Sequence, residues 1–275
     1  MSHSFPSDDP HPVTRFFRRI RTDIVVARRN WDFWNHLAAQ HISLQYARSL
    51  IGPFWLTLTM GMQIVALTYL FTGLFGASLE IVAPWVTIGV IVWTFFSTSL
   101  NDSASILIVS KPYLLESDSS ILGFVTSVIV RNLIVSLHHL ILLGILCIWF
   151  ALWPDLNWLW LGLSIPLVIL FTLGLSVILA ISTARFRDIQ RITESMLMVG
   201  FFLTPVLWRP QELIRNEFIA TYNPFTHLIA IIRDPILGQT PSPLSWSISA
   251  IATAICLIGA IYALGRFRNR IHFWI

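Results

Sequence analysis

Six apolar stretches, most of them about as long as a membrane is thick, constrain this sequence more than any other feature. They cover residues 54–74, 84–100, 124–150, 158–184, 195–208 and 244–264. A bilayer core requires about 20 apolar residues of helix. Charged residues make up only 12% of the chain, about half the share of a soluble domain. Because backbone groups in lipid must bond within their own segment, we expect an all-α integral membrane protein with six transmembrane helices.

The chain ahead of the first apolar stretch divides into two parts. Residues 1–12 are polar and proline-containing, and we expect a disordered tail there. Residues 13–48 are rich in arginine, and Phe16, Ile20 and Ile24 recur every four residues, which places them on one helical face. This pattern predicts a basic amphipathic helix region on the cytoplasmic membrane surface; a solvated charged tail is the alternative. Residues 49–275 then form the transmembrane domain.

The distribution of basic residues predicts the orientation of the chain. Fourteen lysines and arginines lie before the first span, between the second and third, between the fourth and fifth, or after the sixth. Three lie on the other side, and Arg131 falls inside the third span. The side with more basic residues is normally cytoplasmic. We therefore expect a multi-pass protein of the bacterial inner membrane with both termini in the cytoplasm.

Three connections between the spans are unusual. Residues 101–120 are too apolar for a free loop and too polar to span, which predicts a short interfacial helix broken near Lys111 and Pro112. It is either a hairpin on its own bundle or a docking surface for a cytoplasmic partner. Residues 184–189 form a tight charged turn, a pattern that also serves simply to anchor topology. Residues 209–235 predict two short helices that re-enter the outer leaflet and border the path, or else an inert external cap.

Several kinds of chemistry have no motif in the sequence. Lys111 is the single lysine and lies outside any G-x-x-x-x-G-K-S/T pattern, so the chain has no phosphate-binding loop for ATP. Cys147 and Cys256 lie in apolar stretches and are expected to be small buried hydrophobes. His138 and His139 are adjacent and therefore face different ways on a helix, which favours interhelical contacts over a metal site. The basic residues flank apolar spans, which indicates a membrane surface rather than nucleic acid.

Aromatic side chains are abundant, at 13% of the chain. Aromatic faces stack on sugar rings without the tight grip of a charge, so a channel for glycans would use them. Lipid-facing or core positions are the alternative for each one. The candidates on the first two spans are Trp55, Tyr69, Trp93, Phe95 and Phe96.

The order of several short motifs carries a family resemblance over residues 31–268. They are the run from Gln45 to Trp55, the run from Arg185 to Ile189, Thr204-Pro205-Val206, and Tyr222-Asn223-Pro224-Phe225-Thr226 followed by Arg233. The chain resembles the membrane subunit of type-2 ABC transporters that export polysaccharides, in the O-antigen, capsule and teichoic-acid branch. One departure concerns Leu58-Thr59-Met60-Gly61, where such permeases often carry a proline. Gly61 still allows a bend.

The resemblance implies a homodimer of this chain with two copies of a separate ATPase, which binds the ATP and magnesium. The substrate implied is a polyprenyl-diphosphate-linked glycan in a channel at the dimer seam, lined by the aromatic residues above. Residues implied to couple to the ATPase are Lys111, Tyr113, Glu116, Asp118, Arg185, Arg187 and Asp188. Those implied to gate the periplasmic exit are Trp208, Tyr222, Asn223, Pro224 and Arg233. The lipid diphosphate would enter past Arg28, Arg29 and Arg48.

Two rival functions remain open at this point. One is a type-2 ABC permease for a drug or another lipid. The other is a membrane-embedded glycosyl or acyl transferase, which requires carboxylates or histidines near a membrane face. Asp102, Glu116 and Asp118 are the cluster available for it, and they fall in the segment assigned to coupling. We therefore expect a transport subunit that is not itself an enzyme and contains no metal or cofactor.

Overall fold

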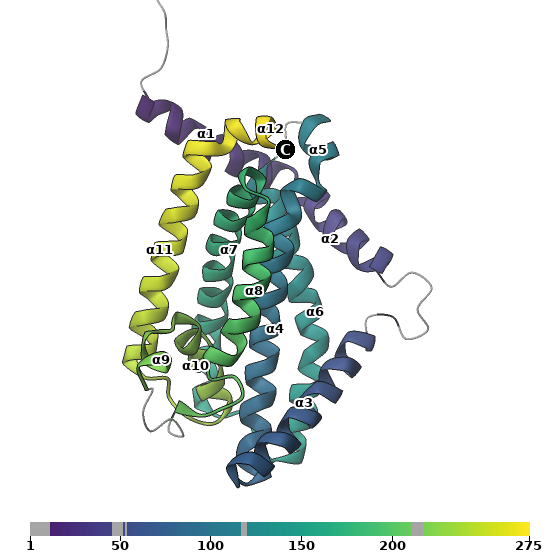
Figure 1. Cartoon of the computed structure of the whole chain (residues 1–275), viewed down its shortest axis with the longest axis vertical. Helices are drawn as coiled ribbons and strands as arrows, with labels where there is room; N and C mark the ends of the chain where they lie inside the picture. Colours follow the sequence, from purple (N-terminus) through teal and green to yellow (C-terminus); the bar gives the residue numbers. More distant parts are fainter. Residues whose placement is uncertain (1–11, 46–51, 53, 117–119, 211–216) are drawn as a thin grey trace, which may run out of the picture.

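The computed structural model describes residues 12–45, 52, 54–116, 120–210 and 217–275, and the ordered elements in this part of the chain are helices. The all-α prediction is confirmed for these residues. Figure 1 shows an elongated bundle in which α1, α5 and α12 lie at one end and α9 and α10 towards the other. The predicted tail up to residue 11, together with Arg48 and Asp118, lies outside the described residues, and the side chain of Glu116 is not described.

The helices follow one another with short connections. Their bounds are α1 Pro12–Arg29, α2 Trp31–Gln45, α3 Phe54–Phe75, α4 Leu79–Val109, α5 Lys111–Glu116, α6 Ile121–Trp149, η1 Leu156–Trp160, α7 Leu161–Arg185, α8 Asp188–Leu203, α9 Glu217–Tyr222, α10 Pro224–Ile236, α11 Pro243–Phe267, η3 Arg268–Arg270 and α12 Ile271–Trp274.

Five helical segments are long and apolar enough to cross a membrane: those that contain α3, α4, α6, α7 and α11. They correspond to five of the six predicted spans. The remaining one, α8, has 16 residues and rises only about 24 Å at 1.5 Å per residue. The bilayer core is about 30 Å thick. A crossing at α8 therefore stays a prediction.

Residues 101–109 are helical, but the prediction that they belong to a separate interfacial helix between two spans is wrong. They are the last turns of α4, which has 31 residues and ends at Val109. Asn101 and Asp102 gave the segment its loop-like polarity, but they lie on a helix that extends beyond the thickness of a bilayer core. The chain breaks only at Ser110, after which α5 begins at Lys111, close to the predicted break.

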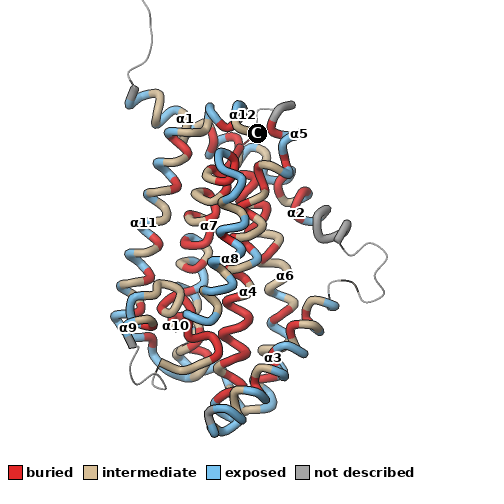
Figure 2. Tube along the Cα trace, viewed as in Figure 1, coloured by how far each residue is buried: buried red, intermediate tan, exposed pale blue. Residues whose placement is uncertain are grey.

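The centre of the bundle is α4, which contacts α3, α6, α7, α8 and α10 and is the most continuously buried helix in Figure 2. Four rings from three helices meet beside it. Phe225 of α10 lies 5.3 Å from Phe96, 5.5 Å from Phe171 and 5.5 Å from Trp93, measured between ring centroids. Edge-to-face rings at such spacings are attractive. This cluster therefore binds α10 into the core of the bundle.

A second close contact joins α7 and α11. A methyl group at Gly174 would stand 2.9 Å from the backbone carbonyl carbon of Cys256. Such a distance is too short for any side chain larger than hydrogen. Small residues that let two backbones approach are the usual device for packing membrane helices, and Gly174 provides it here.

The amphipathic helix α1 is joined to the bundle by one buried carboxylate. Asp23 is fully buried, and its Oδ1 accepts hydrogen bonds from Ile121 N at 3.1 Å and from Arg268 Nε at 3.0 Å. Its Oδ2 accepts from Ser120 Oγ at 2.9 Å and from Leu122 N at 3.0 Å. The first backbone N–H groups of a helix lack intrahelical partners. Asp23 therefore caps α6 from another helix and pairs with the chain segment after α11.

We expect Asp23→Ala to destabilise the bundle by about 3 kcal/mol, because it leaves a guanidinium and two helix N–H groups without their partner. Thermal unfolding of the purified protein in detergent would measure the loss. The matched control is Asp32→Ala, which removes an exposed carboxylate from α2 and should change the midpoint little. Equal shifts for the two variants would contradict this account of Asp23.

Candidate functional site

The loop-rich end of the bundle is organised around α10. Asn223 caps this helix by accepting from Phe225 N at 3.0 Å, and its Nδ2 donates to Thr204 Oγ1 at 2.8 Å. Ser164 of α7 donates to the carbonyl oxygen of Ile231 at 2.6 Å. His227 contacts Ser245 Oγ at 3.1 Å. Polar contacts therefore tie α10 to the chain after α8, to α7 and to α11.

Arg233 is the most unusual side chain at this end, since it is only 2% exposed. Its Nη1 donates to the carbonyl oxygen of Pro205 at 2.9 Å, and its guanidinium carbon lies 3.8 Å from the centre of the Trp85 ring. The Trp85 Nε1 in turn donates to the carbonyl oxygen of Trp208 at 3.1 Å. Nε and Nη2 of Arg233 have no hydrogen-bond partner within the described part of the chain. The positive charge of Arg233 is therefore stabilised mainly by the face of the Trp85 ring. This cation–π interaction is stronger when water is excluded.

Gly89 makes room for this arginine. A methyl group built on Gly89 would collide with Arg233 Nη2 and would stand 2.9 Å from the carbonyl oxygen of Val206. The contact joins α4, α10 and the irregular segment after α8 at one point. Of the residues predicted at the gate, Trp208, Asn223 and Arg233 belong to this assembly, while Tyr222 is 82% exposed and Pro224 begins α10.

A groove of about 540 Å³, lined by polar and apolar side chains and called the polar groove for its row of hydroxyl and amide groups, lies along α4 between α3 and α8. Thr94, Ser97, Thr98 and Asn101 lie on it at helical spacing. Thr98 Oγ1 donates to the carbonyl oxygen of Thr94 at 2.7 Å, within its own helix. The groove is also lined by two further polar residues, Gln63 and Glu194, and by the apolar residues Val90, Trp93, Leu197, Met198, Phe201 and Phe202. The groove therefore presents hydroxyl and amide groups on a surface that otherwise faces lipid.

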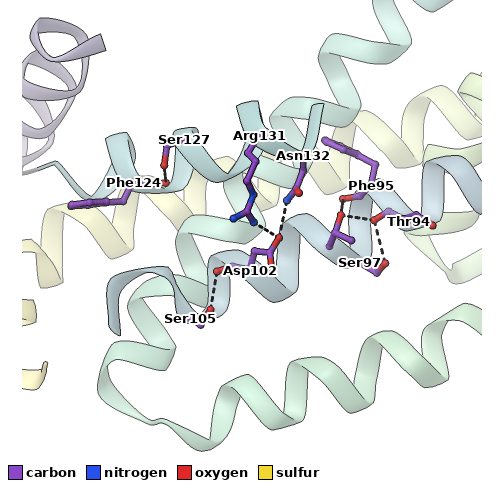
Figure 3. Close-up of polar contacts among 10 residues, drawn as sticks. Thr94, Phe95, Ser97, Asp102, Ser105, Phe124, Ser127, Arg131 and Asn132 are labelled. Atoms are coloured by element: carbon purple, nitrogen blue, oxygen red, sulfur yellow. Dashed lines mark hydrogen bonds and ion pairs between the residues drawn. The ribbon is translucent and has the colours of Figure 1, made fainter. Parts of the chain in front are cut away.

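An ion pair continues this polar stripe toward the α5 end (Figure 3). Asp102 of α4 forms a salt bridge with Arg131 of α6 and accepts a hydrogen bond from Asn132 Nδ2 at 3.1 Å. Ser105, one turn further along α4, donates to the carbonyl oxygen of Asp102 at 3.1 Å. Charged side chains inside membrane segments commonly pair with one another. The pair fixes α4 against α6 and adds charge to the same side of α4 that bears the groove.

The two predicted coupling elements lie at the same end of the bundle (Figure 1). One is α5, where Lys111 Nζ donates to the carbonyl oxygen of Ile275 at 2.6 Å and the Tyr113 ring lies 6.2 Å from Phe33. The other is the α7–α8 turn, in which Arg185, Phe186, Arg187 and Asp188 are all exposed. The Arg185 guanidinium lies 5.3 Å from the Trp274 ring. The helix α5 therefore contacts Ile275, and the α7–α8 turn contacts the neighbouring Trp274 of α12.

The five predicted channel aromatics occupy three different environments. Trp55 and Tyr69 of α3 are 51% and 83% exposed. Trp93 is among the residues lining the groove but is only 5% exposed, and its ring touches Phe201 and Phe225. Phe95 and Phe96 are buried in the core. An exposed or groove-lining position is compatible with a channel, and for Trp55, Tyr69 and Trp93 the channel role stays a prediction.

The remaining predicted residues have simple placements. Arg28 and Arg29 are exposed at the end of α1. His138 bonds the carbonyl oxygen of Ile134 at 2.8 Å and lies 5.9 Å from the Phe54 ring, so it does contact another helix. Both cysteines are free thiols and partly buried. Within the described ranges, no three His, Cys, Asp or Glu side chains gather as a metal site.

Sequence reasoning missed the groove, the Asp102–Arg131 pair and the arginine–tryptophan contact at α10. A signal for the groove was present, because Thr94, Ser97, Thr98, Asn101 and Asp102 recur at helical spacing within an apolar stretch. No comparable signal pairs Asp102 with Arg131, which are 29 residues apart.

These features define a polytopic helical membrane domain with a surface groove, a short helix and an exposed turn at one end, and the largely buried helix α10 towards the other. The sequence matches the family described as ABC-2 type transporter over residues 34–237. That match covers most of the chain, and the protein therefore belongs to the ABC-2 type transporter family. Such permeases are transport subunits that work with a partner ATPase subunit.

Several curated proteins are similar over most of their length. The chain is 30% identical over 188 residues to the O-antigen export system permease protein RfbA of Myxococcus xanthus, covering 66% of this chain and 69% of that protein. Two proteins of the same name from Klebsiella pneumoniae are each 26% identical. They cover 72% and 70% of this chain, and 78% and 75% of their own lengths.

We expect Gly89→Ala to destabilise the protein by about 1–3 kcal/mol, because the methyl group displaces Arg233 or the backbone of Val206. Thermal unfolding in detergent would measure the change. Gly144→Ala is the control, since a methyl group at that position in α6 meets nothing within 4 Å, and alanine favours a helix over glycine. A neutral or stabilising Gly89→Ala would contradict the packing described here.

Proposed function

We propose that this chain is the permease subunit of an ABC exporter that moves a lipid-linked polysaccharide of the O-antigen or capsule type across the inner membrane. The observation that carries the proposal is the polar groove on α4, in a chain whose relatives are named O-antigen export permeases. A polymer of sugars offers many hydroxyl groups, and a groove of hydroxyls, amides and aromatic edges can exchange hydrogen bonds with each of them in turn. Fixed charges hold a sliding chain more tightly, and Glu194 is the one ionisable side chain among the twelve described lining residues.

The groove supports a homodimer. Hydroxyl and amide groups exposed to hydrocarbon are costly, and α8 contacts α4 and α7 but leaves Met196, Met198 and Phe202 more than 60% exposed. A second copy placed against the α3–α4–α8 face would cover these side chains and enclose two grooves as one polar channel. Trp55, Tyr69 and Trp93 would then lie along the path.

The orientation proposed places α5 and the α7–α8 turn in the cytoplasm. Lys111, Arg185, Arg187 and Arg191 lie at that end of the bundle, together with the arginines of α1 and of η3. Basic residues gather on the cytoplasmic side of membrane proteins. Two copies of a separate ATPase, which bind ATP and magnesium, would contact α5 and the exposed turn from Arg185 to Asp188.

The same orientation places α9 and α10 on the periplasmic side, as a re-entrant pair that follows a short fifth span at α8 and precedes the sixth span at α11. The burial of Leu228, Ile229 and Ile231 in the bundle core supports this placement. Irregular backbone at membrane depth requires protein cover, and the Arg233 contact with Pro205 provides it. The α10 assembly would thus form the outer border of the channel, where the polymer leaves.

The mechanism proposed is a rigid-body motion. Closure of the two ATPases on ATP presses on α5 and the α7–α8 turn, and the force reaches the seam through α4 and α8. The lipid diphosphate enters from the inner leaflet past the exposed Arg28 and Arg29, since anionic groups are attracted to basic residues at the membrane surface. Energy and chemistry are supplied by the ATPase, so this subunit performs no catalysis of its own.

Purification from native membranes tests the proposal directly. We expect the chain to retain an ATPase with a phosphate-binding loop in equal amounts, and ATP hydrolysis to rise when lipid-linked glycan is added. Replacing Arg187 and Asp188 by alanine should reduce this association without unfolding the permease, because both side chains are exposed. A chain that purifies without any ATPase would refute the exporter function.

Cross-linking tests the dimer seam. In a chain with Cys147→Ala and Cys256→Ala, we expect Met198→Cys on α8 to be linked into a dimer by a short bifunctional maleimide. Ile258→Cys on α11 is the matched control, because its side chain is 66% exposed against 69% for Met198. The proposed seam predicts dimers for the first variant alone. Dimers through Ile258 alone would move the seam to α11.

A further inference from the structure

A smaller pocket adjoins the polar groove, between α3, α4 and α6. It has a volume of about 180 Å³, and we call it the side recess. Gln63, Thr94 and Thr98 line both the side recess and the polar groove, so the two spaces meet along these residues. The other described residues that line the side recess are Leu56, Thr59, Met60, Asn132, Val135, Ser136 and His139.

His139 of α6 is a buried polar residue in this lining. It is only 3% exposed, and neither of its ring nitrogens has a hydrogen-bond partner within the described part of the chain. A neutral imidazole has one N–H donor and one acceptor. Burying such groups without partners is costly. An occupant of the side recess that both donates and accepts hydrogen bonds would satisfy both nitrogens.

The hydroxyl groups of the side recess are arranged as acceptors. Ser136 Oγ donates to the carbonyl oxygen of Asn132 at 2.8 Å. Thr98 Oγ1 donates to the carbonyl oxygen of Thr94 at 2.7 Å. Each hydroxyl has given its one proton to its own helix, and its oxygen still has a lone pair to offer. The occupant must therefore supply O–H or N–H donors, which the oxygens of an ionised phosphate lack.

A sugar ring has the chemistry and the size that this lining requires. Each of its hydroxyl groups donates one hydrogen bond and accepts others. Its C–H groups can pack against the carbon surfaces of Leu56, Met60 and Val135. The volume corresponds to roughly six water molecules at about 30 Å³ each, which holds one ring but no stretch of polymer.

We propose that the side recess binds one sugar ring of the transported glycan, and that His139 recognises the hydroxyl groups of that ring. This inference rests on the proposed export of a polysaccharide along the polar groove. A ring that turns out of the groove past Gln63 enters the recess while it stays beside Thr94 and Thr98. The groove exchanges hydrogen bonds with any hydroxyl group, whereas the recess selects a ring by its size and by the positions of its hydroxyl groups.

Protection of introduced cysteines tests whether a sugar occupies the recess. Ser136 lines the recess but not the groove, and Ser97 lines the groove but not the recess. Each is replaced by cysteine in a chain with Cys147→Ala and Cys256→Ala. The protein, purified with the ATPase it retains, is placed in phosphatidylcholine nanodiscs and labelled with a small water-soluble methanethiosulfonate. We expect lipid-linked glycan from the native cells to slow labelling roughly tenfold at both positions, as in a site that excludes solvent when occupied.

The pair of positions separates the recess from the exporter function. Protection of Ser97→Cys without protection of Ser136→Cys would overturn the recess and leave the exporter function intact. Protection of neither would refute both. Failure of Ser136→Cys to react in the absence of glycan would also overturn the proposal, because a recess closed to water admits no sugar. Equal protection by phosphatidylglycerol without glycan would assign the recess to the glycerol of a lipid headgroup instead.

A second experiment tests His139 itself through the ATP hydrolysis that glycan stimulates. We expect H139L to raise the glycan concentration for half-maximal stimulation by about fivefold, as for the loss of one hydrogen bond. H139Q should recover part of this loss, because an amide keeps a donor and an acceptor. The matched control is H138L, since His138 does not line the recess, and it should behave as the parent does. Equal shifts for H139L and H138L would overturn the role of His139, whereas a parent that glycan does not stimulate would refute the exporter function itself.

Discussion

The hydrocarbon surroundings offer no hydrogen-bond partner to a protein, and the rest of the structure follows from this constraint. Several hydroxyl groups in the spanning helices bond within their own helix, as when Thr172 Oγ1 donates to the carbonyl oxygen of Val168 at 2.8 Å and Thr253 to that of Ser249 at 2.7 Å. The backbone after α8 leaves helical geometry, and there the carbonyl oxygen of Pro205 is supplied with a donor by Arg233. A buried arginine is thus a consequence of an irregular segment that must stay dry.

The spanning helices could be predicted because their length and apolarity suffice to identify them. The end of α4 could not, since Asn101 and Asp102 are typical of a loop until their partners in three dimensions are known. Phe95 and Phe96 show a related difficulty. Adjacent residues face different ways on a helix, but both are buried because neighbouring helices enclose α4 on several sides.

The packing of α1 and α2 against α6 depends on single residues. Sequence patterns do not distinguish these residues from their neighbours in the chain. Asp23 appears among arginines as part of a charged tail, yet it is buried and caps α6. Gly123 appears as a neutral residue in an apolar stretch, yet a methyl group there would collide with Trp34. The periodicity of Phe16 and Ile20 correctly predicted a helix. The partner of each helix could not be predicted, because it is set by contacts between residues about 90 or more positions apart.

The shortness of α8 has a consequence for passage through the membrane. Sixteen residues span about 6 Å less than a typical hydrocarbon layer. In the proposed arrangement, in which α8 crosses the membrane, the bilayer beside it would thin or draw its headgroups inward. The low-dielectric layer would then be narrowest along the groove. A hydroxyl-rich polymer that slid past α8 would leave fewer of its groups dehydrated at any moment, so the barrier to its movement would be lower there than elsewhere in the membrane.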